Sequence, residues 1–209
     1  MSSDKKHRVD RNWINEHIND PYVKKAKKEG YRARSAFKLE ELDKKYKLLR
    51  PGLNVIDLGA APGGWCQYAR KRLGKKDKLI AVDLLAIKPL AGVEIIQGDF
   101  TEEEIRNQLS QAIDNQGFDL VLSDMAPNIS GIALADQARS IGMAEGILDW
   151  SCSVLAKDGA LLMKVFQGSG FDQLRQEALK HFQSVVTRKP EASRSRSSEV
   201  YLLARKFKG

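Results

Sequence analysis

The residues best placed to do chemistry are four aspartates and a lysine on predicted strands. Asp57, Asp83, Asp99 and Asp124 each close an apolar segment, and Lys164 lies inside a fifth, LLMKVF. In an open α/β sheet, the carboxyl ends of parallel strands form the edge where ligands bind. A single aspartate at such a position often only caps a turn. Four acids and an amine at one edge instead predict a site that binds a cation and moves a proton.

A glycine-rich loop follows the first of these strands. The segment DLGAAPGGW, residues 57–65, contains Gly59, Gly63 and Gly64, and glycine lets the backbone approach a ligand closely. Asp83 follows Gly63 by 20 residues, a spacing that suits an acid bonded to ribose hydroxyls. The loop matches neither GxxxxGK[ST] nor GxGxxG, and its acidic surroundings disfavour a pyrophosphate. The loop therefore predicts an adenosine-containing cationic cofactor, and S-adenosylmethionine fits.

Alternating strand and helix patterns are expected to position these residues. Apolar runs predict strands over 53–59, 78–85, 93–100, 118–126, 159–168, 184–190 and 199–207. Helical periodicity predicts helices over 11–30 (interrupted near NDPY), 32–49, 63–74, 101–113, 134–155 and 171–182, with Thr101 as the N-cap of the fourth. Repeated strand–helix units predict a parallel sheet covered by helices on both faces.

The composition fits one domain of ordinary size that needs no disulfide framework or structural metal. The chain has 209 residues, of which 42% are hydrophobic. It has no apolar run long enough to span a membrane and no secretory signal at its start, so we expect a cytoplasmic protein without a membrane partner. Two cysteines and three histidines argue against a disulfide framework or a zinc site, and no metal is predicted.

The net charge of +8 is unevenly distributed along the chain. Residues 1–50 hold 15 basic against 8 acidic residues, residues 51–170 hold 11 against 15, and residues 171–209 hold 9 against 4. Basic flanks around an acidic centre favour a phosphate-rich partner, although each lysine run alone would suit a solvated helix face.

Basic residues for such a partner are found in both flanks. The serine-rich stretch RKPEASRSRSSE can either hold phosphates or form a flexible basic hairpin loop. The residues of the two flanks predicted to bind this phosphate-rich partner, an RNA if the family resemblance given below holds, are Arg32, Arg34, Arg188, Lys189, Arg194 and Arg196.

Five motifs together resemble the FtsJ/RlmE family of large-subunit ribosomal RNA 2′-O-ribose methyltransferases. They are VIDLGAAPGGW, EIIQGDF, LSDMAPNISG, KVFQG and RKPEASRSRSSEVYLLA, and the likeness runs from about residue 20 to the C-terminus. The resemblance implies a Rossmann-like class I methyltransferase fold, α/β, with a seven-stranded, mostly parallel sheet whose last strand is antiparallel. It also implies S-adenosylmethionine as cofactor.

The resemblance further implies the residues of the site. A catalytic tetrad falls on Lys38, Asp124, Lys164 and Glu199, with Lys164 as the base or as the group that orients the acceptor oxygen. Cofactor contacts implied by the family or expected from the loop fall on Asp57, Gly59, Gly63, Gly64, Trp65, Asp83, Asp99 and Asp124, with Asp99 at the adenine. Trp65 would equally suit a core position. Cys66 departs from the serine that the family often has there.

The leading hypothesis is methylation of a uridine ribose in 23S-type ribosomal RNA, in the assembled large subunit, by a monomeric enzyme. Residues 1–50 are predicted to form a basic helical extension and residues 51–209 the methyltransferase domain, in one compact unit. Alternatives are methylation of another RNA (transfer RNA or a messenger cap), a non-catalytic RNA-binding assembly factor, and a nucleotide-dependent oxidoreductase.

Overall fold

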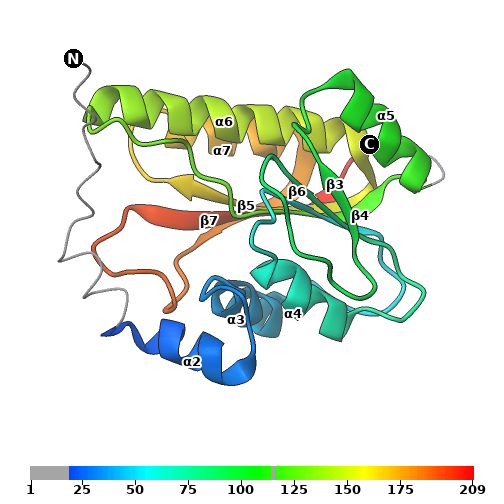
Figure 1. Ribbon diagram of the computed structural model, residues 1–209. Helices are drawn as coiled ribbons and strands as arrows, with labels where there is room; N and C mark the ends of the chain where they lie inside the picture. The colour runs from blue at the N-terminus through cyan, green and yellow to red at the C-terminus, as the bar shows by residue number, and fades with distance from the viewer. Residues whose placement is uncertain (1–18, 114–115) are drawn as a thin grey trace, which may run out of the picture.

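The predicted strands pair into one seven-stranded sheet in the computed structural model, which describes residues 19–113 and 116–209 (Figure 1). The strands are β1 Val55–Leu58, β2 Leu79–Asp83, β3 Glu94–Gln97, β4 Phe118–Ser123, β5 Leu155–Phe166, β6 Phe182–Arg188 and β7 Glu199–Phe207. Their order is β3-β2-β1-β4-β5-β7-β6. The strands β1 to β5 pair in parallel, whereas β7 runs antiparallel to both β5 and β6. The predicted mostly parallel sheet with an antiparallel last strand is confirmed.

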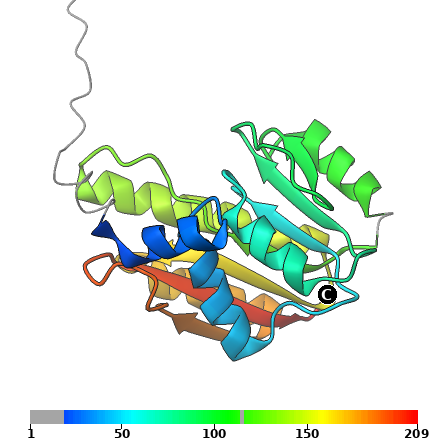
Figure 2. The ribbon, with the colours of Figure 1, turned by 60° about the horizontal axis from the view of Figure 1, so that its bottom comes forward.

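Helices cover both faces of this sheet (Figures 1 and 2). One face carries α2 Pro21–Glu29, α3 Ala36–Tyr46 and α4 Gly64–Arg72. The other carries α5 Glu103–Ala112, α6 Ala133–Val154 and α7 Phe171–His181. Because both faces are covered, the central strands need apolar residues at nearly every position rather than at alternate ones.

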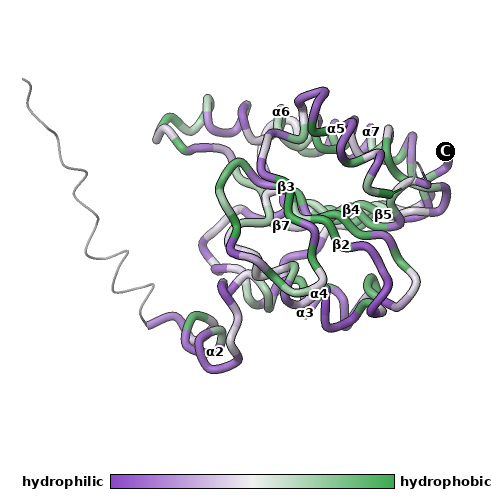
Figure 3. Tube along the Cα trace, turned by 45° about the vertical axis from the view of Figure 1, so that its right-hand side comes forward, coloured by the Kyte–Doolittle hydropathy of each residue, from purple (hydrophilic) through white to green (hydrophobic). Residues whose placement is uncertain are grey.

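The strands divide their side chains between two core clusters. Ile56 and Leu58 of β1 belong to the cluster under α5, α6 and α7, whereas Val55 belongs to the cluster under α3 and α4. This alternation follows from the two-residue period of a strand. Figure 3 shows the resulting apolar centre along β2, β4 and β5 between more polar outer segments.

The N-terminal helices begin and end where the sequence provides caps. The Asp20 carboxylate accepts hydrogen bonds from the backbone N–H groups of Tyr22 (2.9 Å) and Val23 (3.3 Å), and Gly30 ends α2 in the left-handed conformation. Residues 11–18 of the predicted first helix lie outside the described residues. Leu39 and Leu42 of α3 join the same core cluster as Val55 of β1, and the domain boundary at residue 50 stays a prediction.

The predicted N-cap at Thr101 is wrong. The helix α5 begins two residues later, after Glu102, and that residue makes no side-chain capping bond. The Thr101 hydroxyl instead donates to the Asp99 carboxylate at 2.7 Å, and the Thr101 N–H donates to the same oxygen at 2.9 Å. The Thr101 hydroxyl is therefore directed toward Asp99, one residue before the observed N-cap.

Three further features concern membrane crossing, the cysteines and metal binding. Among the described residues, no helix is long and apolar enough to cross a membrane. Both cysteines are free thiols, Cys66 in the core and Cys152 partly exposed. Within the same ranges, no group of three or more histidine, cysteine, aspartate or glutamate side chains is arranged to hold a metal ion.

Candidate active site

An acidic cavity of about 670 Å³ lies at the carboxyl ends of β1, β2, β3 and β4. This is the position where the chain changes direction across the sheet, since β1 pairs with β2 on one side and β4 on the other. Asp83, Asp99 and Asp124 line the cavity, and no lysine or arginine of residues 19–113 and 116–209 does. A cavity with three carboxylates and no cation fits a positively charged ligand.

Two of these acids are held in place by hydrogen bonds from neighbouring loops. The Asp83 carboxylate accepts the backbone N–H groups of Ala61 and Leu85, each at 2.8 Å. The Asp99 carboxylate accepts both bonds from Thr101. Each acid is therefore oriented before any ligand arrives, so little conformational entropy is lost on binding.

Gly59 is the glycine that the cavity requires for steric reasons. Its φ is 72°, and a Cβ added there would lie 2.2 Å from Cγ of Met125, which also lines the cavity. Any side chain at this position would be strained and would collide with the cavity wall.

The structure places four of the eight predicted cofactor residues on the cavity: Gly59, Asp83, Asp99 and Asp124. The other four do not line it. Gly63 and Gly64 pack against Arg32 and Ala33, respectively. The Trp65 indole is buried and donates to the backbone oxygen of Ser35 at 2.8 Å. Trp65 thus joins α4 to the segment that leads into α3.

Asp57 is the fourth of these residues and is fully buried. One carboxylate oxygen accepts a hydrogen bond from the Cys66 thiol at 3.1 Å, and the other has no hydrogen-bond partner. Burial, together with the neighbouring charges of Asp124 and Asp83, raises the pKa of Asp57 to about 7, although the Cys66 hydrogen bond lowers it.

We expect this shifted pKa to appear in the pH dependence of stability. Between its ordinary pKa of 3.8 and a folded value of about 7, Asp57 loses its proton in the unfolded chain but keeps it in the folded one. The contribution of Asp57 to the free energy of unfolding is therefore greatest in acid. It decreases by about 1.4 kcal/mol per pH unit between pH 3.8 and about pH 7, and it is fully lost above that range.

The measurement is the free energy of unfolding of Asp57→Asn and of the parent by urea titration from pH 4 to pH 8. The variant should gain stability relative to the parent as pH rises. An Asp172→Asn control changes an exposed carboxylate of α7. Parallel curves for Asp57→Asn and the parent would contradict the assignment.

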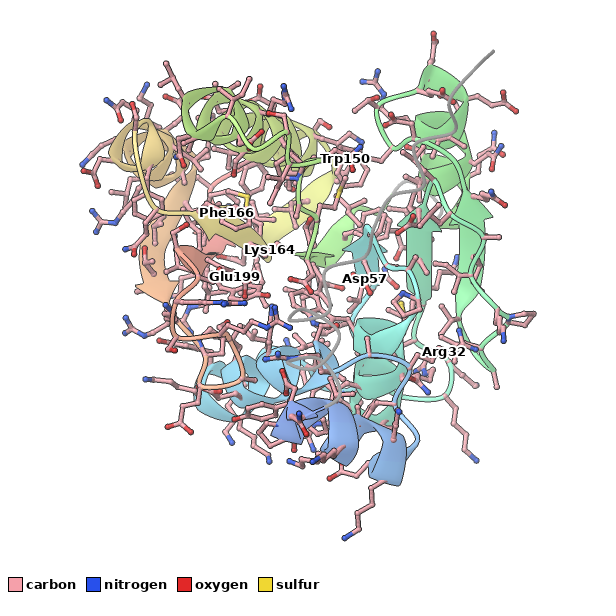
Figure 4. All side chains as sticks on the ribbon, turned by 60° about the vertical axis from the view of Figure 1, so that its left-hand side comes forward. Arg32, Asp57, Trp150, Lys164, Phe166 and Glu199 are labelled. Atoms are coloured by element: carbon pink, nitrogen blue, oxygen red, sulfur yellow. The ribbon has the colours of Figure 1, made fainter. Side chains whose placement is uncertain are left out.

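Two largely buried ion pairs lie near the carboxyl ends of the strands, and Asp124 of the first pair lines the acidic cavity. The Lys164 ammonium lies 3.2 Å from the Asp124 carboxylate and also donates to the Asp124 backbone oxygen. The Lys38 ammonium lies 2.6 Å from the Glu199 carboxylate, which also accepts the Ser193 hydroxyl at 2.8 Å. Figure 4 looks onto this edge of the sheet, with Lys164 and Glu199 near its centre.

The electrostatics of the second pair favour a permanent charge on Glu199. Burial alone would raise its pKa, but the charge and hydrogen bond of Lys38, with the Ser193 hydroxyl, bring the pKa of Glu199 below its usual value. The carboxylate therefore remains ionised and holds the Lys38 ammonium in place.

Tyr201 connects the two pairs, and the sequence analysis did not single it out. Its hydroxyl donates to the Asp124 carboxylate at 2.5 Å, and the Lys38 ammonium lies 5.6 Å from its ring centroid. Burial, followed by the charges of Asp124 and Glu199, raises the pKa of Tyr201 well above its usual value. The sequence contained a signal for Tyr201, namely its spacing from Glu199. Residues 199 and 201 of a strand point to the same face, so a site that includes Glu199 should also include Tyr201.

A second cavity, of about 500 Å³, opens beside the Lys38–Glu199 pair. Its charged lining consists of four cations and one carboxylate: Arg34, Lys38, Arg194, Arg196 and Glu199. Three predicted RNA-binding residues thus lie together next to the tetrad. A cavity with this excess of cations fits an anion such as a phosphate.

The structure gives the other three predicted RNA-binding residues different contacts. The Arg32 guanidinium donates to the backbone oxygens of Pro62 (3.1 Å), Lys88 (2.7 Å) and Pro89 (2.9 Å), so it ties the glycine-rich loop to the segment after β2. Arg188 hydrogen-bonds Tyr46. Lys189 donates to two backbone oxygens of its own loop, those of Ser195 and Ser197. None of the three lines the basic cavity.

Comparison with known proteins identifies the family of this chain. The model of the FtsJ-like methyltransferase family matches residues 31–207. Ribosomal RNA large subunit methyltransferase E of Bordetella pertussis is 52% identical over 208 residues, covering 97% of this chain and 99% of the relative. The enzyme of the same name from Hahella chejuensis is 51% identical over 197 residues, covering 94% and 96%.

A solved structure agrees as well. The crystal structure of a Plasmodium falciparum protein named as a ribosomal RNA methyltransferase superposes with a TM-score of 0.77 at 28% identity. It covers 86% of this chain and 100% of its own. The family match spans both ion pairs, the glycine-rich loop and the acidic cavity. The chain belongs to the FtsJ-like methyltransferase family, whose members use S-adenosylmethionine.

Proposed function

We propose that this methyltransferase modifies the ribose 2′-oxygen of a uridine in 23S-type ribosomal RNA, within the assembled large subunit. The observation that carries the proposal is the placement of an acidic cavity at Asp124 of one ion pair and of a basic cavity at the Lys38–Glu199 pair, with Tyr201 in contact with both pairs. The names of the relatives support a large-subunit RNA as substrate. We also predict that the enzyme is a monomer and that it is located in the cytoplasm.

The acidic cavity fits S-adenosylmethionine because its lining offers carboxylates to a sulfonium and an ammonium group. When bound, this cofactor supplies a methyl group that its positive sulfur has already activated. Asp83 would accept the ribose hydroxyls, Asp99 would face the adenine, and Gly59 would let the backbone lie against the ligand. Contacts from Asp57, Gly63, Gly64 and Trp65 remain predictions.

The chain's own residues then prepare the acceptor oxygen. The Lys164 amine would contact the 2′-oxygen and either take its proton or direct its lone pair toward the methyl carbon. Asp124 holds that amine through two contacts and is itself held by Tyr201. Lys38, fixed by Glu199, would bind the nucleotide on the side of the basic cavity. Positioning of this kind supplies on the order of 7–11 kcal/mol in favourable cases.

Two glycines in α6 give the cofactor assignment a sharp test. Gly142 and Gly146 line the acidic cavity, and a Cβ at either position would meet no atom within 4 Å. Gly146→Ala should therefore raise the free energy of unfolding of the ligand-free protein by about 0.5–1 kcal/mol, since glycine disfavours a helix. The added methyl group would occupy cavity space and weaken S-adenosylmethionine binding by about tenfold.

Urea titration and calorimetry measure the two effects of Gly146→Ala separately. Glu145→Ala is the control, because Glu145 is exposed on the same helix and does not line the cavity. If Gly146→Ala bound the cofactor as tightly as the parent, the cofactor would not reach this side of the cavity.

RNA binding should depend steeply on salt. Arg34, Arg194 and Arg196 line a cavity that fits phosphate, and each neutralised phosphate releases counterions from the RNA. RNA affinity measured between about 50 and about 200 mM salt should fall steeply, and Arg194→Gln with Arg196→Gln should flatten the slope. A flat response of the parent would remove phosphate contact as the source of affinity.

Mapping ribose methylation tests the proposed substrate. Ribosomal and transfer RNA would be compared from cells with the parent chain, without it, and with Lys164→Ala. One uridine of the large-subunit RNA should lose its methyl group in the last two. Loss of a transfer RNA site instead, or of none, would overturn the proposal.

A further inference from the structure

Large apolar side chains are strongly exposed at only two places among the described residues. Leu84 and Leu85 form one and line the acidic cavity. The other consists of Ile129, Ile132 and Leu134, which are 75%, 65% and 79% exposed. We name these three residues the aliphatic prong. Single exposed leucines are common on protein surfaces, but three within six residues indicate a surface that meets a partner.

The prong spans the end of a loop and the first turn of helix α6, which contains Leu134. The loop connects β4 to α6, and its turn is fixed by the Asp136 carboxylate. That carboxylate accepts the Ser130 hydroxyl (2.6 Å) and the backbone N–H groups of Ser130 (2.8 Å) and Gly131 (2.9 Å). The Arg139 guanidinium also donates to the Asn128 backbone oxygen at 3.3 Å. The backbone is therefore shaped to present the aliphatic side chains to solvent.

The prong and the basic cavity lie on opposite sides of the proposed reaction centre. The sheet order β4-β5-β7 places the prong after β4, Lys164 on β5, and Glu199 at the start of β7. The loop between β6 and β7 carries Arg194 and Arg196. Figures 1 and 2 show the two loops along the same edge of the molecule, with strands β5 and β7 between them.

The centre itself is recessed. The side chains of Lys164, Asp124 and Glu199 are 9%, 18% and 13% exposed. A ribose that reaches the Lys164 amine must therefore leave the stack formed by its neighbours, as nucleotides do when enzymes act on them in a pocket. The bases left behind lose a stacking partner, and proteins that unstack bases insert aliphatic side chains at such steps.

We infer that the aliphatic prong packs against the bases that flank the target nucleotide and holds that nucleotide out toward Lys164. The basic cavity and the aliphatic prong are together complementary to RNA, because the cavity offers cations to phosphates and the prong offers aliphatic groups to bases. This inference rests on the proposed function, since it takes a ribose in structured RNA as the acceptor.

The test compares a triple serine variant, Ile129→Ser, Ile132→Ser and Leu134→Ser, with the parent in the full-length protein. The control variant, Ile129→Leu with Ile132→Leu, keeps the aliphatic character. The substrate is large ribosomal subunits from cells that lack this chain. Methylation rate at saturating S-adenosylmethionine, cofactor affinity, and chemical reactivity of the target uridine base in the complex are measured for each.

The serine variant should methylate the subunits at least about tenfold more slowly and leave the uridine base unreactive. Its cofactor affinity should match that of the parent, because the prong does not line the acidic cavity. The leucine variant should behave as the parent does. Equal rates for the serine variant and the parent would overturn the inference.

Two further results would also overturn it. One is a serine variant that loses subunit binding yet still exposes the uridine once bound, which would identify a protein docking surface. The other is a parent dimer that the serine variant lacks. If the parent itself methylated no subunits, the proposed function would fail, whereas equal methylation by parent and serine variant would reject the prong alone.

Discussion

Replacing Lys164 with alanine is expected to lower the rate of methyl transfer by about 10³-fold while leaving the affinity for S-adenosylmethionine nearly unchanged. The amine lies 3.2 Å from the Asp124 carboxylate but does not itself line the acidic cavity. Its loss therefore removes the group that prepares the acceptor oxygen without removing a cofactor contact. Single-turnover rates on large subunits and calorimetry with the cofactor separate the two effects.

Lys180→Ala is the matched control, since Lys180 is an exposed lysine paired with Glu177 on α7. It should retain the parent rate. If Lys164→Ala turned over near the parent rate, Lys164 would have no part in the chemistry. If it lost cofactor binding as well, the amine would belong to the cofactor site.

Asp124→Ala should have the second large effect, and unlike Lys164→Ala it should lower both the rate of methyl transfer and the affinity for the cofactor. Asp124 lines the acidic cavity, pairs with Lys164 and accepts the Tyr201 hydroxyl. Its removal leaves a buried ammonium without its partner. We expect the rate to fall by about 10³-fold and cofactor affinity by about tenfold, because one cavity carboxylate is lost as well.

A double-mutant cycle checks whether the two residues act together. Residues that act as one unit show strongly non-additive losses, so Asp124→Ala with Lys164→Ala should be little slower than either single variant. Asp124→Asn keeps the shape of the side chain and is the control for packing. Additive losses in the cycle would mean that Asp124 and Lys164 serve separate steps.

The fold could be read from the sequence because its signals are local. Apolar runs such as LIAV (residues 79–82) and LVL (residues 120–122) are unbroken, and a strand needs such a run only when both faces of its sheet are covered. The helix termini were less predictable. Thr101 has the right residue type for an N-cap, but its hydroxyl hydrogen-bonds Asp99 and the helix begins after Glu102. No sequence pattern shows which of these two arrangements Thr101 adopts.

The site could be predicted in part, because strand ends share one edge of a parallel sheet. That rule placed Asp83, Asp99 and Asp124 together, and the structure brings them to one cavity. It could not place Arg32, whose three backbone contacts depend on how distant loops meet. Nor did it find Tyr201, whose role depends on the antiparallel register that sets it opposite Lys164.

A crystal structure with S-adenosylmethionine bound is the most direct test of how this site is assembled. The account predicts the adenosine between Asp83 and Asp99, and the sulfonium methyl group at Asp124, directed toward the Lys164 amine. A cofactor bound outside the acidic cavity, or with its methyl group turned away from Lys164, would contradict it.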